Sequence, residues 1–193
     1  DIIRVATPKG RFIYDPTRDQ SKTIVAFAAG SGITPIMSIV RAVLEESKDQ
    51  KCVLIYGNKS PEKTIFYQAL LELQSAYEDR LELQFVFSNS HEAGAEYGRI
   101  DKAYTRSAIN TVLDSQKPAI YYLCGPEGMI HNVKDVLISH NVPESSILFE
   151  LFTASESVTT ETVANSSGTI EATILFDDEK EVISMDNDTT ILE

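Results

Sequence analysis

The sequence predicts a doubly wound α/β domain built on a parallel sheet of five strands, followed by a partial β-hairpin. Short and almost continuous apolar runs recur along the chain, which is typical of strands buried on both faces of a parallel sheet. Most of these runs are followed by apolar residues at helical spacing. Successive strand–helix steps of this kind favour right-handed crossovers and therefore a parallel, doubly wound arrangement.

The first strand–helix unit is organised around a glycine turn. An apolar run at Thr23–Ala28 leads into the sequence Ala-Gly-Ser-Gly-Ile-Thr-Pro-Ile at residues 29–36. Gly30 and Gly32 permit a sharp reversal, and from Ile33 the apolar residues recur at helical spacing. Free N–H groups and the helix dipole point at such a turn, so the pattern favours an anion. It lacks the Gly-Lys-Ser/Thr of a P-loop and the third glycine of the dinucleotide fingerprint, which leaves a turn without a ligand as the alternative.

The remaining elements alternate between apolar strands and helices. In chain order we expect a strand at Lys51–Gly57, a helix at Lys63–Tyr77, a strand at Leu81–Phe87, a polar loop at Glu92–Tyr97, a helix at Asp101–Val112, a strand at Ala119–Leu123, a helix ending near His140 and a strand at Ser146–Phe152. Ligands of doubly wound sheets lie at the carboxyl ends of the strands. The loops at 29–35, 57–61 and 88–91 should therefore converge.

The two ends of the chain differ from this domain. Residues 153–168 are rich in Ser, Thr, Glu and Ala without an apolar period, which predicts a flexible linker. Thr169–Phe176 and Glu181–Met185 flank a polar turn as the strands of a β-hairpin do. Residues 1–20 are too short to form a domain, so we expect either the end of a preceding domain or a simple β-arm.

Charge and cysteine content exclude several function classes. The net charge of −12 argues against nucleic acid or an anionic membrane as a partner. Cys52 and Cys124 both lie in apolar runs, which suggests buried thiols in a reducing compartment, and we expect a cytoplasmic protein. Two cysteines are too few for an iron–sulfur cluster, which needs four ligands, and no metal ligands are expected within this chain. No signal peptide or spanning segment is visible in the sequence.

Three signals in order carry a family resemblance. Ala-Gly-Ser-Gly-Ile-Thr-Pro-Ile follows the first strand, Tyr-Leu-Cys-Gly-Pro-Glu-Gly-Met follows the fourth, and Phe-Glu-Leu-Phe lies in the last. Residues 21–152 resemble the nicotinamide-nucleotide domain of the ferredoxin–NADP reductase superfamily. Residues 1–20 resemble the end of its flavin-binding barrel, 153–168 a linker, and 169–193 the truncated start of a plant-type 2Fe–2S ferredoxin domain. This order is similar to the oxygenase reductases that include the reductase component of phenylacetyl-coenzyme A epoxidase.

The resemblance implies roles for residues of both glycine turns and of the neighbouring loops. It implies catalytic roles for Cys124, Thr34 and Glu150, with Cys124 beside the nicotinamide, where a small polarizable side chain can touch an aromatic ring. The cofactor-binding residues that it implies are Gly30, Ser31, Gly32, Ile33, Thr34, Pro35, Asn58, Lys59, Ser88, Asn89, Arg99, Cys124, Gly125, Pro126, Glu127, Met129 and Phe152. The alternatives are that Cys124 is a core thiol and that Glu150 is a solvated acid on an edge strand.

NADP is the nucleotide we expect, with NAD as the alternative. Ser88, Lys59 and Arg99 can offer a hydroxyl and two positive charges to a 2′-phosphate. Against this, family members specific for NADP often carry an arginine where this chain has Asn89, and surface cations also serve solubility.

The implied activity of the intact protein is that of an NAD(P)H-dependent flavin and iron–sulfur reductase. Hydride passes from NAD(P)H to FAD, and electrons pass through a 2Fe–2S cluster to an oxygenase component, in phenylacetate or other aromatic degradation. We expect this chain alone to be inactive, because the flavin barrel and the cluster ligands are missing from it. The alternative is a redox-inactive nucleotide-sensing or docking module on the same fold.

Overall fold

The computed structural model describes residues 10–112, 118–152, 169–176 and 179–186. By its internal contacts the chain divides into two compact units, residues 1–154 and 155–193. The predicted linker at 153–168 lies outside the described residues. Among the described residues, no helix combines the length and apolar character that crossing a membrane requires.

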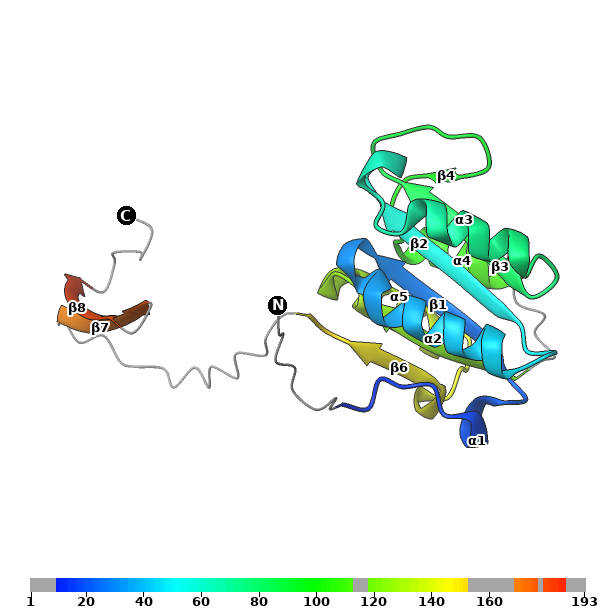
Figure 1. Ribbon diagram of the computed structural model, residues 1–193, viewed down its shortest axis with the longest axis horizontal. Helices are drawn as coiled ribbons and strands as arrows, with labels where there is room; N and C mark the ends of the chain where they lie inside the picture. Colours follow the sequence, from blue (N-terminus) through cyan, green and yellow to red (C-terminus); the bar gives the residue numbers. More distant parts are fainter. Residues whose placement is uncertain (1–9, 113–117, 153–168, 177–178, 187–193) are drawn as a thin grey trace, which may run out of the picture. The chain divides into compact units, whose positions relative to one another are not determined.

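The first unit is a parallel sheet in the order β4-β3-β2-β1-β5-β6 (Figure 1). The strands are β1 (Thr23–Ala29), β2 (Cys52–Asn58), β3 (Leu81–Phe87), β4 (Glu96–Tyr97), β5 (Ala119–Cys124) and β6 (Ile147–Glu150). The five predicted strands are confirmed, although β6 is shorter than predicted at both ends. Ser146 belongs to the 3₁₀ turn η3 (Glu144–Ser146), and the strand ends at Glu150 instead of Phe152. β1 pairs with β2 on one side and with β5 on the other, so the strand order reverses at this point.

The polar loop predicted at Glu92–Tyr97 is wrong in its last two residues. Glu96 and Tyr97 form β4, which pairs with Val86 and Phe87 at the end of β3. Both residues of β4 are exposed, so no buried apolar alternation marks the strand in the sequence.

Two layers of helices cover the two faces of the sheet (Figure 1). On one face, α2 (Ile33–Glu46) and α3 (Tyr67–Ala76) pack on a core that includes Ile24 and Ala26 of β1. On the other face, α4 (Lys102–Val112) and α5 (Glu127–Ser139) pack on a core that includes Val25 and Phe27. Successive β1 residues thus point to opposite cores, which explains why the whole strand is apolar.

The helix predicted from Lys63 begins later in the structure. Residues Pro61–Lys63 form a separate 3₁₀ turn, η2, and α3 starts only at Tyr67. Phe66 between them has a φ of +61°, in the left-handed region, which interrupts a continuous helix. Ile65 and Phe66 precede α3 and are 40% and 44% exposed, so they do not extend its buried face.

The segment before β1 contains a short helix, α1 (Pro16–Asp19), which was not predicted. Asp15 caps this helix by accepting a hydrogen bond from the Thr17 N–H.

The second unit contains two strands. β7 (Thr169–Phe176) and β8 (Glu179–Asp186) form an antiparallel pair. β8 begins two residues earlier than the predicted strand, since Glu179 pairs with Phe176 and Lys180 with Leu175.

Candidate functional site

The first glycine turn follows β1 directly and depends on Gly30. Residues Gly30–Gly32 form the 3₁₀ turn η1, which leads into α2. Gly30 has a φ of +53°, a conformation that residues with a side chain adopt only at a cost. The hydroxyl of the buried Tyr56 on β2 donates a hydrogen bond of 2.9 Å to the Gly30 carbonyl. β2 therefore holds the turn in place.

The two predicted glycine turns meet at Gly32. A Cβ atom at Gly32 would lie 2.1 Å from the carbonyl oxygen of Cys124 and 2.7 Å from the nitrogen of Gly125. No side chain fits between them, so only glycine permits this approach. The ends of β1 and β5 are thus packed together at the point where the strand order reverses, which is where ligands of doubly wound sheets bind.

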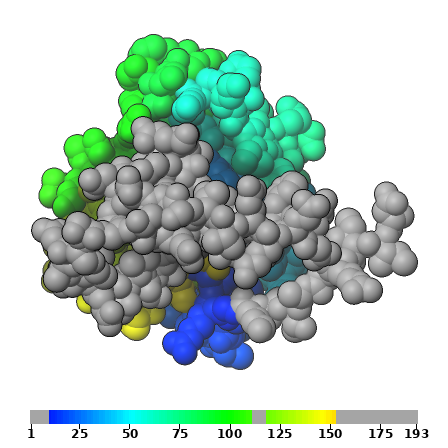
Figure 2. Space-filling model, turned by 90° about the vertical axis from the view of Figure 1, so that its left-hand side faces the viewer, coloured from blue at the N-terminus to red at the C-terminus, as the bar shows by residue number. Residues whose placement is uncertain are grey.

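The loops after β2 and β3 converge beside this point. The Ser88 N–H donates to the Asn58 carbonyl at 3.0 Å, and the Asn89 N–H donates to the Lys59 carbonyl at 2.9 Å. In Figure 2 the segments that follow β2, in cyan, and β3, in green, lie side by side at the top. The expected convergence of these loops is confirmed.

A cavity of about 740 Å³ opens among the carboxyl ends of β1, β2, β3 and β5. Its volume lies in the range of natural ligand sites. Its lining residues come from the ends of β1, β2 and β3, from η1 and η2, from the loops after β2, β3, β4 and β5, and from the first turns of α5. They are Ala29, Gly30, Gly57, Asn58, Lys59, Lys63, Val86, Ser88, Gly98, Arg99, Ile100, Asp101, Pro126, Gly128, Met129 and Asn132.

Asn58 lines the cavity from the end of β2. Its side-chain nitrogen is buried, with the Tyr56 hydroxyl as a neighbour. This nitrogen therefore does not face the cavity, and a ligand there meets other atoms of Asn58.

The charge of the cavity is positive. Lys59, Lys63 and Arg99 line it, and none of them has an ion-pair partner within the described part of the chain. Asp101 is the acidic residue among the described lining residues, and its carboxylate accepts a 2.8 Å hydrogen bond from the Tyr104 N–H at the start of α4. Three cations line the cavity with one acid, and that acid caps the start of α4, so the lining favours an anionic ligand.

Seven of the site residues implied by the resemblance line this cavity. They are Gly30, Asn58, Lys59, Ser88, Arg99, Pro126 and Met129. The others do not line it and are Ser31, Gly32, Ile33, Thr34, Pro35, Asn89, Cys124, Gly125, Glu127, Glu150 and Phe152. The Thr34 hydroxyl instead donates to the Ser31 carbonyl at 3.0 Å, which braces the start of α2.

Cys124 is buried at the end of β5. Its side chain is 0% exposed, and burial together with the nearby Glu150 raises the pKa of its thiol to about 11. The thiol is therefore uncharged at neutral pH and is not an activated nucleophile. Glu150 pairs in register with Cys124 from β6, and Phe152, just beyond that strand, is 49% exposed.

Sequence reasoning missed three polar residues of the cavity: Lys63, Asp101 and Asn132. The sequence places Lys63 at the start of a helix, whereas it ends η2, close behind the carboxyl end of β2. Pro61, which begins η2 directly after Ser60, is the local signal of a short helical turn at this position. Asn132 lies on α5 and carries no signal of its own in the sequence.

Comparison with known proteins agrees with this geometry. The family described as the oxidoreductase NAD-binding domain matches residues 27–135. One component of the 1,2-phenylacetyl-CoA epoxidase of Escherichia coli K12 is 31% identical over 151 residues, which cover 78% of this chain and 42% of that protein. The flavohemoprotein of Candida albicans is 36% identical over 144 residues, which cover 74% of this chain and 35% of that protein. The chain thus spans less than half the length of these curated relatives.

Solved structures show the same fold. The CS-b5R domains of human Ncb5or in the NAD⁺ form match with a TM-score of 0.65 at 23% identity, over 74% of this chain and 40% of that chain. The family match covers more than half of the present sequence and includes both glycine turns. The chain therefore belongs to the oxidoreductase NAD-binding domain family and carries the NAD-binding domain of ferredoxin reductase-like oxidoreductases.

Proposed function

We propose that this chain is the NADP(H)-binding part of a reductase that passes hydride from NADPH to FAD and then sends electrons through a 2Fe–2S cluster to an oxygenase. The observation that carries the proposal is the cavity at the carboxyl ends of the strands, which Lys59, Lys63 and Arg99 line without ion-pair partners among the described residues. The family match supports the nicotinamide nucleotide as the ligand.

The preference for NADP rests on the unpaired cations. A 2′-phosphate is an anion that charge-assisted hydrogen bonds recognise, and Lys59, Lys63 and Arg99 offer three such donors on loops around one cavity. An NAD site typically presents an acid to the ribose hydroxyls. Asp101, the acid at this cavity, already accepts a hydrogen bond from the start of α4.

In this proposal the pyrophosphate binds at the glycine turn and the start of α2. Gly30 faces the cavity, and the N-terminus of α2 begins at Ile33, immediately after η1. Backbone N–H groups at a helix start favour a phosphate without any charged side chain. In this proposal Ser31, Gly32, Thr34 and Pro35 shape the turn, because they lie outside the cavity lining.

Cys124 and Gly125 form the nicotinamide side of the proposed site. The nicotinamide and the flavin supply the redox chemistry when they are bound, and the protein supplies position and electrostatics. A neutral thiol at Cys124 adds no charge beside the reacting carbon. Glu150 and Phe152 are proposed to border the flavin, since β6 pairs with β5 at the level of Cys124.

The described residues do not fit a 2Fe–2S cluster. Such a cluster needs four thiolate ligands, whereas Cys52 and Cys124 are 1% and 0% exposed and stand on the different strands β2 and β5. The proposed cluster therefore belongs to a further part of the intact protein. Support for an oxygenase as the acceptor is the similarity to the 1,2-phenylacetyl-CoA epoxidase component. The same similarity makes phenylacetate or other aromatic degradation the proposed setting.

Anaerobic titration of the full-length protein with NADPH and with NADH tests this function. We expect the flavin absorbance to bleach in both titrations, at a lower concentration of NADPH than of NADH. Equal bleaching by both nucleotides would overturn the NADP preference. Nucleotide binding without bleaching would favour a sensing or docking module on the same fold.

A further inference from the structure

A buried polar cluster fastens the segment that precedes β1 to the sheet. The carboxylate of Asp19 is fully buried and accepts hydrogen bonds of 2.5 Å from both Nε and Nη2 of Arg18. The hydroxyl of Tyr122, on β5, donates to the same carboxylate at 2.9 Å and accepts from Arg18 Nη2 at 2.9 Å. Three side chains from two distant parts of the sequence thus form one closed network.

Further contacts fix the segment on both sides of this network. The carbonyl of Ile13 lies 3.0 Å from the Tyr122 hydroxyl, and the ring of Phe12 packs edge-on against the Tyr122 ring at 5.4 Å. The side-chain amide of the buried Gln50 donates to the backbone carbonyl of Asp19 at 2.7 Å and to that of Lys22 at 2.8 Å. Residues 10–20, which run beside β6 (Figure 1), are therefore tied down along most of their length.

An ion pair whose carboxylate is fully buried is a poor way to gain stability by itself. Removing the Asp19 charge and part of the Arg18 guanidinium from water is costly, and apolar side chains of similar volume often do as well. Directed hydrogen bonds, in contrast, permit one arrangement of the partners, because a displaced carboxylate is left buried without its donors. The Asp19 network therefore fixes the position of residues 10–20 on the sheet more strictly than apolar packing does.

β5, the strand to which the Asp19 network attaches this segment, ends at the candidate nucleotide site. Tyr122 lies two residues before Cys124 on β5 and pairs with Ala26 of β1, which runs on to the Gly30 turn. The segment is thus fixed to the same two strands whose carboxyl ends form the centre of the candidate site. Movement of the segment relative to the site would require these hydrogen bonds to break.

We propose that Arg18, Asp19 and Tyr122 are positioning residues that set the angle at which the flavin-binding part of the intact protein presents its flavin to the nicotinamide. This inference rests on the proposed function. Hydride transfer needs the reacting atoms in near-contact geometry, and a misplacement of about 1 Å can cost roughly 10²-fold in rate. None of the three residues lines the nucleotide cavity, so they act on the geometry of transfer and not on nucleotide affinity.

The test is Tyr122→Phe in the full-length holoenzyme, since this change keeps the ring and removes the hydroxyl at the centre of the network. We expect stopped-flow flavin reduction at saturating NADPH to slow about tenfold, with the Kd for NADP⁺ changed by less than about twofold. Tyr121→Phe is the matched control, because Tyr121 is a buried neighbour that faces the opposite core and makes no side-chain hydrogen bond among the described residues. It should leave the rate unchanged.

A second variant keeps the inference testable if Tyr122→Phe does not fold. Arg18→Lys retains the charge but loses the two-pronged contact with Asp19, at a side chain that is 33% exposed, and should slow flavin reduction by a smaller factor. Unchanged flavin reduction in the folded variants, with only a lower melting temperature, would contradict the inference and leave a merely structural cluster. Failure of NAD(P)H to reduce the flavin of the wild type would instead contradict the proposed function.

Discussion

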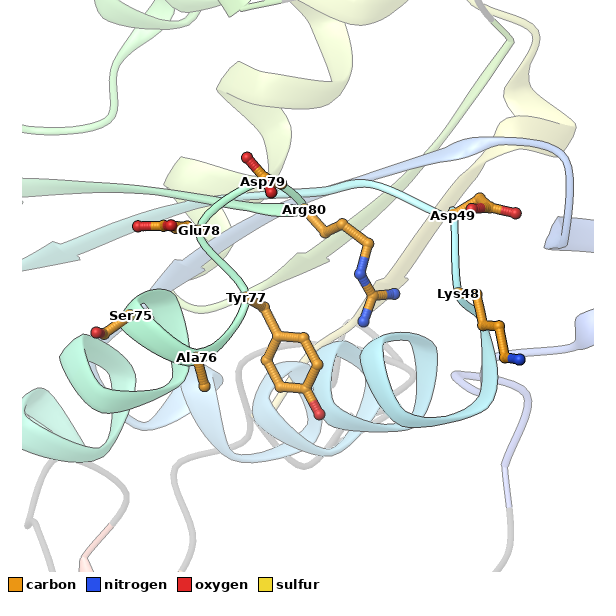
Figure 3. A pocket seen from close by; sticks show the side chains of 8 residues that line it. All are labelled: Lys48, Asp49, Ser75, Ala76, Tyr77, Glu78, Asp79 and Arg80. Atoms are coloured by element: carbon orange, nitrogen blue, oxygen red, sulfur yellow. The ribbon is translucent and has the colours of Figure 1, made fainter.

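Two hollows of similar size lie at opposite edges of the sheet, and they differ in the charges of the side chains that line them. The hollow at the carboxyl ends has a volume of about 740 Å³, and the one at the amino ends of β2 and β3 has about 610 Å³ (Figure 3). In the second hollow Arg80 donates to the carbonyls of Leu44 and Ser47, at the C-terminus of α2, at 2.8 and 2.6 Å. The Arg80 guanidinium also lies 4.9 Å from the centre of the Tyr77 ring.

The comparison separates a structural cavity from a binding cavity. Arg80 caps the C-terminus of α2, because it donates hydrogen bonds to carbonyls that lack partners within the helix. At the carboxyl ends, the cations Lys59, Lys63 and Arg99 have no ion-pair partners within the described residues. Size does not distinguish the two hollows, whereas charge does. Three cations and one acid line the first, and two cations and three acids line the second.

The largest effect is expected from a substitution that forces the two glycine turns apart. Gly32→Ala places a methyl group 2.1 Å from the Cys124 carbonyl oxygen, so the backbone must shift. We expect a loss of about 3 kcal/mol in the free energy of unfolding and at least a tenfold weaker Kd for NADP⁺. Urea unfolding and isothermal titration calorimetry measure the two quantities.

Gly128→Ala is the control for the stability measurement. A Cβ atom at Gly128, in the first turn of α5, meets nothing within 4 Å. This variant should be as stable as the wild type, or more stable by up to about 1 kcal/mol. If Gly32→Ala were equally stable, the close approach of the two turns would not hold in solution.

The second effect concerns the hollow at the amino ends. Arg80→Met keeps most of the side-chain volume but removes both donors to the end of α2. We expect a loss of about 2 kcal/mol in stability, because hydrogen bonds to charged groups contribute about 1.5–3 kcal/mol. The Kd for NADP⁺ should stay within about twofold. A weaker Kd without a loss of stability would reverse the assignment of the two hollows.

The third effect concerns the cations at the carboxyl ends. Lys63→Met should weaken NADP⁺ binding about fivefold to tenfold, which corresponds to about 1–1.4 kcal/mol, and should leave NAD⁺ binding unchanged. Stability should change by less than about 0.5 kcal/mol, since Lys63 is exposed. The matched control is Lys48→Met, because Lys48 lines the other hollow. Equal loss of NADP⁺ affinity in both variants would show a diffuse charge effect and not a site.

The smallest effect is a pH dependence of stability that arises from Asp19. Burial alone raises the pKa of the Asp19 carboxyl, but hydrogen bonds from Arg18, the Asp15 N–H and Tyr122 outweigh burial and hold its pKa below the ordinary value. Its contribution is therefore complete above the unfolded-state pKa near 4 and is lost as the pH falls through the lower folded-state pKa.

Denaturant midpoints measured from pH 6 down to pH 3 check this expectation. Asp19→Asn should be less stable at pH 6 and should lose less stability than the wild type as the pH falls. Parallel curves for the two proteins would show that Asp19 titrates alike in the folded and unfolded states.

The sequence predicts the features that rest on local pattern. The five long strands follow from their apolar runs, and the Gly30 turn follows from the spacing of its glycines. β4 escaped prediction because both of its residues are exposed, and the start of α3 was misplaced because nothing in the sequence marks the left-handed Phe66. The contact between Asp19 and Tyr122 joins residues 103 positions apart, which no local pattern reveals.

The residues that line the cavity were predictable to a similar degree and for the same reason. Asn58 ends β2 and Ser88 directly follows β3, and both line the cavity because the carboxyl ends of parallel strands share one edge. Lys63 and Asn132 reach the cavity from η2 and α5, so their place depends on how these elements pack on the sheet.

Hydrogen exchange of the full-length protein with and without saturating NADP⁺ tests the central claim most directly. The account predicts slower exchange of the backbone amides at residues 29–33, 57–63 and 98–101 when the nucleotide is bound. It predicts no change at residues 48–49 and 75–80, which line the hollow at the amino ends. Protection confined to residues 48–49 and 75–80, or absent from both regions, would contradict it.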